Sequence, residues 1–261
     1  MTALLEVSHV GKVFGGLRAV SDVTFEVEQG AIVSMIGPNG AGKTTAFNCI
    51  TGLYPVTTGD IRFQGRSIVG LPPHRITRLG ITRTFQNIRL FSYMTAVDNV
   101  MVGEHVRMHA KVWDAVFRTP SARKEEHDVE QRALAIMRRL GIDQYADVYA
   151  RNMPYGLQRR LEIARALASN PALLLLDEPA AGLNPQEKRE LMGVIAQLRA
   201  DGLTVFLIEH DMRVVMEVSD RIVVLDYGEK IADGEPAEVR ANQRVIEAYL
   251  GSGAAEAAKT A

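Results

Sequence analysis

The run of residues 37–45 constrains the fold of this chain more than any other feature. It carries two glycines, a lysine and a threonine at the spacing of a phosphate-binding loop. Apolar residues at 31–36 predict a buried strand before the loop, and residues 45–50 predict a helix after it. The sequence therefore predicts a nucleotide-binding α/β fold. The loop consists of Gly37, Pro38, Asn39, Gly40, Ala41, Gly42, Lys43, Thr44 and Thr45.

Each part of this phosphate loop predicts a contact with a nucleotide. The glycines let backbone N–H groups turn toward the phosphates, and the N-terminus of the following helix adds its positive end. Lys43 is expected to reach the β- and γ-phosphates, and the Thr44 hydroxyl is expected to ligate Mg²⁺. The alternative is a glycine-rich turn that does no more than connect a strand to a helix.

A second part of the site is predicted where the apolar run 173–176 ends in two carboxylates, Asp177 and Glu178. Parallel sheets bind ligands at the carboxyl ends of their strands, which is where these side chains would emerge. Asp177 is expected to hold Mg²⁺ through water, and Glu178 to orient and polarise the water that attacks the γ-phosphate. The alternative is an acidic, solvated turn.

Composition limits the partners and the compartment. The 30 basic and 31 acidic residues give no overall field that would draw the chain to nucleic acid or to an anionic membrane. The single cysteine, Cys49, is expected to be a buried, reduced thiol of a cytoplasmic protein. We find no membrane-spanning run and no signal peptide, so a role at a membrane would require other chains.

The hydrophobic pattern divides residues 1–250 into an α/β core and an insert. Alternating residues at 5–8 and 23–27 predict short antiparallel strands that precede the phosphate loop. Between residues 91 and 158 the pattern becomes helical, which predicts a helical subdomain inserted between core segments 1–90 and 159–250. Residues 251–261 are small and polar and are expected to form a flexible tail. Continuous apolar strands are predicted at 32–36, 173–176, 204–208 and 222–225.

With both nucleotide motifs in place, the chain resembles the ATPase subunit of an ABC transporter from its first strand to about Leu250. The resemblance implies a P-loop (RecA-like) core with a small antiparallel β subdomain and an inserted α-helical subdomain, using ATP and Mg²⁺. Gln86 matches the family's glutamine loop, which adds a metal ligand and joins the site to the helices. His210 matches the switch histidine expected at the γ-phosphate, and Phe14 the ring that stacks on adenine. Taken alone, these would be an exposed glutamine, a structural histidine and a core phenylalanine.

Residues 152–160, the signature segment, occupy the place of a motif that is usually Leu-Ser-Gly-Gly-Gln. Pro154 replaces the serine, Tyr155 the first glycine and Leu157 the glutamine. Gly156 and the start of a helix predicted at 158–168 remain, and the resemblance implies that they face the nucleotide of a partner ATPase. The alternative is that Pro154 simply shapes a turn before a helix.

Residues 181–185, the dimer loop, match the segment through which two ATPase subunits sense each other. A local role is predicted beside that one, with Asn184 as N-cap, Pro185 at the first helical position and Glu187 completing a capping box.

His105 and His109 have a metal-compatible spacing, but we favour a solvated helix face because no carboxylate-histidine motif surrounds them.

Within the family, residues 83–91 and 155–165 resemble the branched-chain amino acid importer ATPase of the LivG type. The resemblance implies membrane permeases, a second ATPase subunit and a periplasmic or surface binding protein. It places the chain at the cytoplasmic face of the inner membrane, with the helical insert near residues 91–94 against the permease. Two alternatives remain open: a soluble ABC ATPase acting in translation or DNA repair, and an importer for amides or another small solute.

Overall fold

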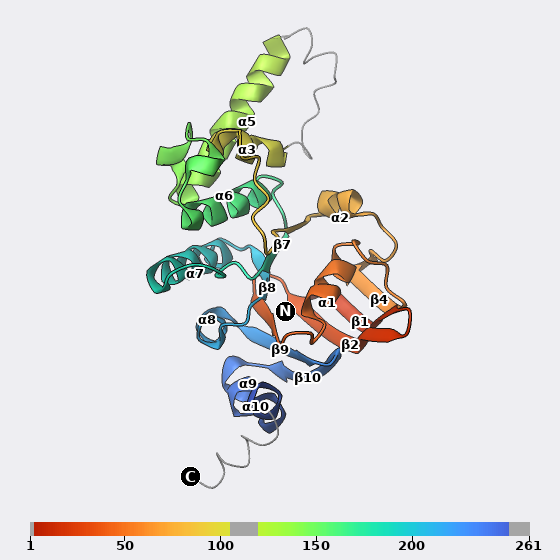
Figure 1. The fold of residues 1–261 in the computed structure, drawn as a ribbon. Coiled ribbons are helices and arrows are strands. Elements are labelled where there is room, and N and C mark those ends of the chain that lie inside the picture. The colour runs from red at the N-terminus through yellow and green to blue at the C-terminus, as the bar shows by residue number, and fades with distance from the viewer. Residues whose placement is uncertain (1–2, 105–119, 251–261) are drawn as a thin grey trace.

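The structure is a computed structural model that describes residues 3–104 and 120–250. Two sheets form the α/β body, one group of helices lies at one end, and two short helices lie at the opposite end (Figure 1). The helix face predicted to carry His105 and His109, and the tail predicted at 251–261, fall outside the described residues.

The larger sheet has the strand order β10-β9-β3-β8-β7-β6, in which β10 alone is paired antiparallel. Every residue of β3, β7 and β8 is buried, as expected for apolar strands covered on both faces. The predictions at 32–36 and 204–208 are confirmed, and the other two central strands extend slightly further. The strands are β3 (Ile32–Ile36), β6 (Ile81–Arg83), β7 (Leu173–Asp177), β8 (Thr204–Ile208), β9 (Arg221–Asp226) and β10 (Glu229–Gly234).

The smaller sheet is antiparallel and has the order β2-β1-β4-β5. It confirms the predicted antiparallel strands, although β1 and β2 are each 12 residues long rather than short. The rings of Phe25 and Phe47 both pack on Phe206 of the larger sheet, which joins the two sheets through one apolar core. The strands are β1 (Ala3–Phe14), β2 (Leu17–Glu28), β4 (Thr58–Phe63) and β5 (Arg66–Ser67).

The helices divide into those that cover the larger sheet and those of the insert. The insert helices α3, α5 and α6 pack on one another at the end of the molecule drawn at the top of Figure 1. Two single 3₁₀ turns, Asp143–Tyr145 and Ala150–Asn152, connect α5 to α6. The helices are α1 (Lys43–Ile50), α2 (Pro73–Leu79), α3 (Ala96–Gly103), α5 (Pro120–Arg139), α6 (Tyr155–Leu167), α7 (Pro185–Ala200), α8 (Met212–Val218), α9 (Pro236–Ala241) and α10 (Gln243–Leu250).

Helix α6 begins at Tyr155, earlier than the start predicted at 158. Pro154 has the extended backbone of an N-cap residue, and its carbonyl accepts hydrogen bonds from the N–H groups of Leu157 and Gln158. The helix therefore runs across the predicted boundary between insert and core at 158/159. It packs on α3 and α5 and contributes to the core cluster that also contains β7 and β8.

Two local predictions are confirmed in the α/β core. Asn184 is the N-cap of α7, with a complete capping box to Glu187 and Pro185 at the first turn. Cys49 is buried, and burial raises the pKa of its thiol to about 11. No helix in the described ranges is both long and apolar enough to cross a bilayer.

Candidate active site

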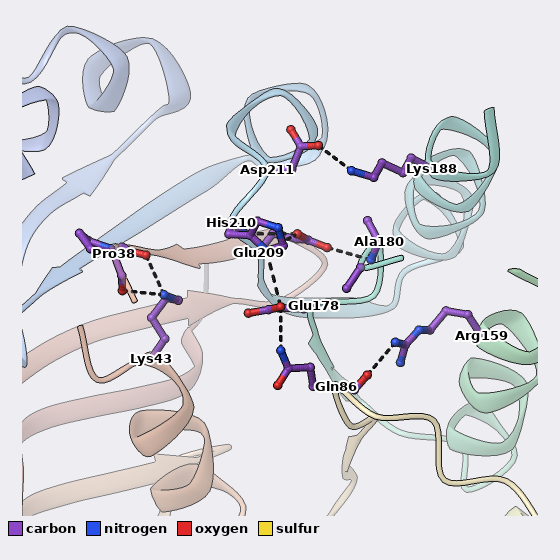
Figure 2. A network of polar contacts seen from close by, with 12 residues as sticks. Pro38, Lys43, Gln86, Arg159, Glu178, Ala180, Lys188, Glu209, His210 and Asp211 are labelled. Carbon is purple, nitrogen blue, oxygen red and sulfur yellow. Dashed lines mark hydrogen bonds and ion pairs between the residues drawn. The ribbon is translucent and has the colours of Figure 1, made fainter. Parts of the chain in front are cut away.

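Three polar segments meet at one edge of the larger sheet because β3, β8 and β7 are parallel neighbours. The phosphate loop leaves the carboxyl end of β3, Asp177 and Glu178 lie at the end of β7, and Glu209 and His210 follow β8. Figure 2 shows Lys43, Glu178 and His210 approaching one another from these three segments. The topology thus brings together motifs that lie more than a hundred residues apart in the chain.

A cavity of about 490 Å³ lies beside the phosphate loop. It is lined by residues 39–45 of the loop together with Gln86, Glu178 and Tyr227, and by residues 17–19 of β2. The backbone fits nothing larger than glycine at two loop positions. A Cβ on Gly37 would lie 2.1 Å from the carbonyl oxygen of Leu225, and Gly42 has a left-handed φ of 98°.

Lys43 is buried at the base of this loop and curls back on it. Its ammonium donates hydrogen bonds to the carbonyl oxygens of Gly37 at 2.7 Å and Pro38 at 3.0 Å. Burial lowers the pKa of Lys43, and the negative charges of Glu178 and Asp177 oppose that shift. The predicted loop lysine therefore sits between the phosphate-binding backbone and the two predicted carboxylates.

Glu178 is the point at which the site residues converge (Figure 2). Its carboxylate accepts a hydrogen bond from Gln86 Nε2 at 3.0 Å and lies 3.5 Å from His210 Nδ1. Its backbone φ of 46° is left-handed, which is strained for a side chain with a Cβ, and its N–H is fixed by Ile208 O at 2.9 Å. The structure thus brings three sequence-predicted residues into contact at a position that the backbone holds under strain.

Asp177 is paired with Arg83 at the end of β6, a contact that was not predicted from the sequence. Arg83 Nη2 lies 2.5 Å from Asp177 Oδ2, and the two side chains are 7% and 6% exposed. Arg83 also donates to Asn48 of α1 at 2.6 Å. The available signal was weak, because a three-residue strand ending in arginine has no pattern that distinguishes it from a loop.

Hard oxygen donors at this edge fit a magnesium ion. The Thr44 hydroxyl and the Gln86 side chain both line the cavity, whereas Asp177, at the end of β7, is absent from the lining and is paired with Arg83, so it would reach the ion through water. The Gln86 amide nitrogen donates a hydrogen bond to Glu178. The side-chain oxygen of Gln86 has no hydrogen-bond partner within residues 3–104 and 120–250. Mg²⁺ typically takes one or two protein oxygens and completes its shell with phosphate and water, which suits this sparse set.

Glu209 is another residue of the site that was not predicted, and its carboxylate connects two loops. It is 0% exposed, and it accepts hydrogen bonds from the N–H groups of Ala180 at 2.8 Å and His210 at 3.2 Å. Burial raises the pKa of Glu209, and these backbone hydrogen bonds counter the shift. Glu209 therefore holds the histidine loop beside the segment that leads from Glu178 to the dimer loop.

Phe14 lies near the site without lining the cavity. It is 40% exposed at the end of β1, and it pairs with Leu17, which does line the cavity. Tyr54 meets its ring edge-on at a centroid distance of 5.2 Å, and Lys12 Nζ lies 4.7 Å from the ring centre. Adenine stacking on Phe14 stays a prediction.

Gly156 is absent from the cavity lining and packs against α7 of its own chain. It is buried, and a Cβ at this position would approach the carboxylate oxygen of Glu187 to 2.9 Å. The neighbouring Tyr155 ring packs on Gly182, and its hydroxyl lies 3.4 Å from the carbonyl of Ala181. The signature segment thus packs against the dimer loop of its own chain, and its role toward a nucleotide stays a prediction.

These features define a class of protein: a P-loop nucleotide-binding enzyme with a phosphate loop on one strand and a carboxylate pair two strands away. Comparison with known proteins narrows the class. The family model described as "ABC transporter" matches residues 20–181, and the model described as "Branched-chain amino acid ATP-binding cassette transporter" matches residues 229–255. The chain belongs to the ABC transporter family, and as a member of it the chain is an ATPase subunit.

Individual relatives agree over nearly the whole chain. The high-affinity branched-chain amino acid transport ATP-binding protein BraF of Pseudomonas aeruginosa is 50% identical, over 95% of this chain and 98% of its own length. The corresponding LivG protein of Escherichia coli is 47% identical, with the same coverage of 95% and 98%. The ADP conformation of MJ1267, an ATP-binding cassette of an ABC transporter, superposes with a TM-score of 0.84 at 31% identity, covering 97% of this chain and 100% of that one. The resemblance inferred from the motifs and the predicted fold class are confirmed.

Proposed function

We propose that this chain is the ATP-hydrolysing subunit of an ABC importer for branched-chain amino acids. The observation that carries the proposal is the 50% identity to a branched-chain amino acid transport subunit along 98% of that protein's length. The match at residues 229–255 supports it, because residues 229–250 of this stretch form β10, α9 and α10, outside the nucleotide-binding motifs. Full-length agreement with a transport subunit also disfavours a soluble switch in translation or DNA repair.

The chemistry follows from the residues that surround the cavity. Backbone N–H groups of the phosphate loop and the Lys43 ammonium bind the β- and γ-phosphates of ATP. Thr44 and Gln86, with Asp177 acting through water, would hold Mg²⁺, which would supply positive charge to neutralise the phosphates. Glu178 accepts a proton from the attacking water, whose oxygen forms the new bond to the γ-phosphorus as the bond to ADP breaks.

His210 and Gln86 orient this step, because both side chains reach the Glu178 carboxylate. The Gln86 amide fixes one carboxylate oxygen at 3.0 Å, and the His210 ring lies 3.5 Å from the same oxygen. Two contacts on one oxygen restrict rotation of the carboxylate and leave the other oxygen for water. Precise placement of the base and the water supplies much of the rate in phosphoryl transfer.

A second ATPase subunit is needed to complete the site. The N-terminus of α6 lies outside the cavity of its own chain, where Tyr155 is half-exposed and Gly156 is buried behind it. A head-to-tail pair of subunits would place this surface over the partner's ATP, with the dimer loops between the two sites. Closure of the two subunits then depends on contacts to the γ-phosphate. Hydrolysis removes these contacts and shifts the population toward the open dimer.

The helical insert supplies the proposed permease-facing surface. Phe91, Tyr93 and Tyr149 are 49%, 77% and 48% exposed, and Arg151 lies over the rings of both tyrosines. An exposed aromatic cluster with a cation above it is typical of a protein interface. Binding there would hold the subunit at the cytoplasmic face of the inner membrane, while a periplasmic or surface binding protein delivers the amino acid.

Uptake in cells that lack this gene tests the proposal. Deletion is expected to abolish uptake of radiolabelled leucine, isoleucine and valine, and the parent gene is expected to restore it. Glu178→Gln should fail to restore uptake, whereas Glu217→Gln, at an exposed carboxylate of α8, should restore it fully. Unchanged leucine uptake in the deletion strain, with loss of uptake of an amide such as acetamide or urea, would assign the importer to a different solute.

A further inference from the structure

Helix α6 carries a buried ion pair that the mechanism above does not use. Arg159 and Glu162 lie one helical turn apart, their side chains are 0% and 1% exposed, and Arg159 Nη1 is 2.9 Å from Glu162 Oε2. Burial raises the pKa of Glu162, an effect that the charge of Arg159 opposes. Such a pair contributes little to stability compared with apolar residues of the same volume, so its presence needs another explanation.

Both members of the pair reach out of α6 to the backbone of the glutamine loop, residues 83–89. Arg159 donates to the carbonyl oxygens of Phe85 and Gln86, each at 2.8 Å, through its two terminal nitrogens. The Glu162 carboxylate accepts from the N–H groups of Phe85 and Arg89, each at the longer distance of 3.4 Å. The two side chains therefore clamp the backbone on both sides of Gln86.

Gln86 connects this clamp to Glu178, the proposed base. The Gln86 carbonyl is bound by Arg159, while the Gln86 side chain donates to Glu178 at 3.0 Å (Figure 2). Packing holds Thr84, which is buried, but Gln86 itself is exposed, so the hydrogen bonds from α6 act on a part of the loop that packing does not hold. A guanidinium fork that binds two consecutive carbonyls fixes the direction of a peptide more firmly than one hydrogen bond does.

We infer that Arg159 and Glu162 are positioning residues that hold the glutamine loop on α6 so that Gln86 meets Glu178 in the geometry required for hydrolysis. This inference rests on the proposed function. Because α6 begins at Tyr155, the clamp also ties the glutamine loop of one site to the signature segment proposed to serve the other. A movement of α6 on dimer closure would be transmitted directly to Gln86.

Arg159→Lys is the primary test, because it keeps a cation beside Glu162 but cannot bridge two carbonyls at once. In the assembled transporter we expect kcat for ATP hydrolysis to fall about 10-fold while KM for ATP changes less than about 2-fold. Arg138→Lys, at an arginine of α5 that is 63% exposed, is the matched control and should retain kcat. Parental kcat in Arg159→Lys would overturn the inference.

A double-mutant cycle separates positioning from a general effect on folding. If Arg159 acts through Gln86, then in a Gln86→Ala background Arg159→Lys should lower kcat by less than about 2-fold further. Losses that multiply independently would contradict the inference.

Hydrogen exchange provides a readout that does not depend on transport. In the isolated chain, Arg159→Lys and Glu162→Gln should each raise amide exchange in a peptide covering residues 84–89 by about 5-fold or more, with β3 unchanged. Glu130→Gln, at a half-exposed glutamate of α5, controls for the loss of charge. Unchanged exchange in residues 84–89 would refute the clamp. A parent complex without ATPase activity would refute the proposed function and leave this result standing.

Discussion

The buried pair between Arg83 and Asp177 leads to a quantitative prediction about stability. Arg83→Met removes the cation 2.5 Å from Asp177 and leaves a carboxylate that is 6% exposed without its partner. Breaking a buried ion pair by removing one member costs about 3–5 kcal/mol, because the remaining charge is not compensated. Methionine retains apolar contact with Phe47 and Phe85, the two rings beside the guanidinium, so the loss should reflect charge more than packing.

Urea unfolding of the isolated chain measures this loss. We expect Arg83→Met to lower the free energy of unfolding by about 3–5 kcal/mol, and the further change Asp177→Asn to restore about 2 kcal/mol by removing the orphaned charge. Arg66→Met, at an exposed arginine of β5, should stay within about 0.5 kcal/mol of the parent. A loss below about 1 kcal/mol in Arg83→Met, or a double variant no more stable than the single one, would refute the reasoning.

Four further outcomes are expected. Lys43→Ala should lose ATP binding in calorimetry, since the phosphates are then met by backbone dipoles and Mg²⁺ alone, and unchanged affinity would remove Lys43 from the phosphates. Pro154→Ala should keep most ATPase activity while Gly156→Asp loses it, because the new carboxylate at the start of α6 would meet that of Glu187 in α7; equal rates would show that this segment completes no site. Alkylation of the native Cys49 thiol should be slow at pH 8 and accelerate about 10-fold per pH unit toward its pKa of about 11, and fast reaction at pH 8 would contradict its burial. A cysteine in place of the exposed Tyr93 should cross-link to the permease, and cross-links solely to the second ATPase would contradict the proposed surface.

The parts of the site that the sequence predicts are those with a local signature. The phosphate loop follows a buried strand and precedes a helix, so its pattern and its context agree. Asp177 and Glu178 follow an apolar strand in the same way, and the parallel topology then brings both motifs to one edge. Asn184 was predictable as an N-cap because a capping box lies within four residues of sequence.

Features that depend on distant partners were not predicted. Arg83 and Asp177 are 94 residues apart, and Arg159 binds carbonyls more than 70 residues away, so no local pattern reveals either contact. Strand β6 is short and ends in a charged residue, and it is stabilised by pairing with β7 rather than by propensity. The start of α6 was placed too late because the segment Tyr155-Gly156 resembles a loop, and tertiary packing on Glu187 and Gly182 decides otherwise.

The central claim is that this chain's ATP hydrolysis, carried out with Glu178 as the base, drives import. The most direct test is leucine uptake into proteoliposomes that contain the purified transporter, its binding protein and ATP on the side of this subunit. The parent should show uptake coupled to ATP hydrolysis, and Glu178→Gln should bind ATP with parental affinity while both uptake and hydrolysis nearly vanish. Hydrolysis and uptake within about 2-fold of the parent in Glu178→Gln would contradict the account.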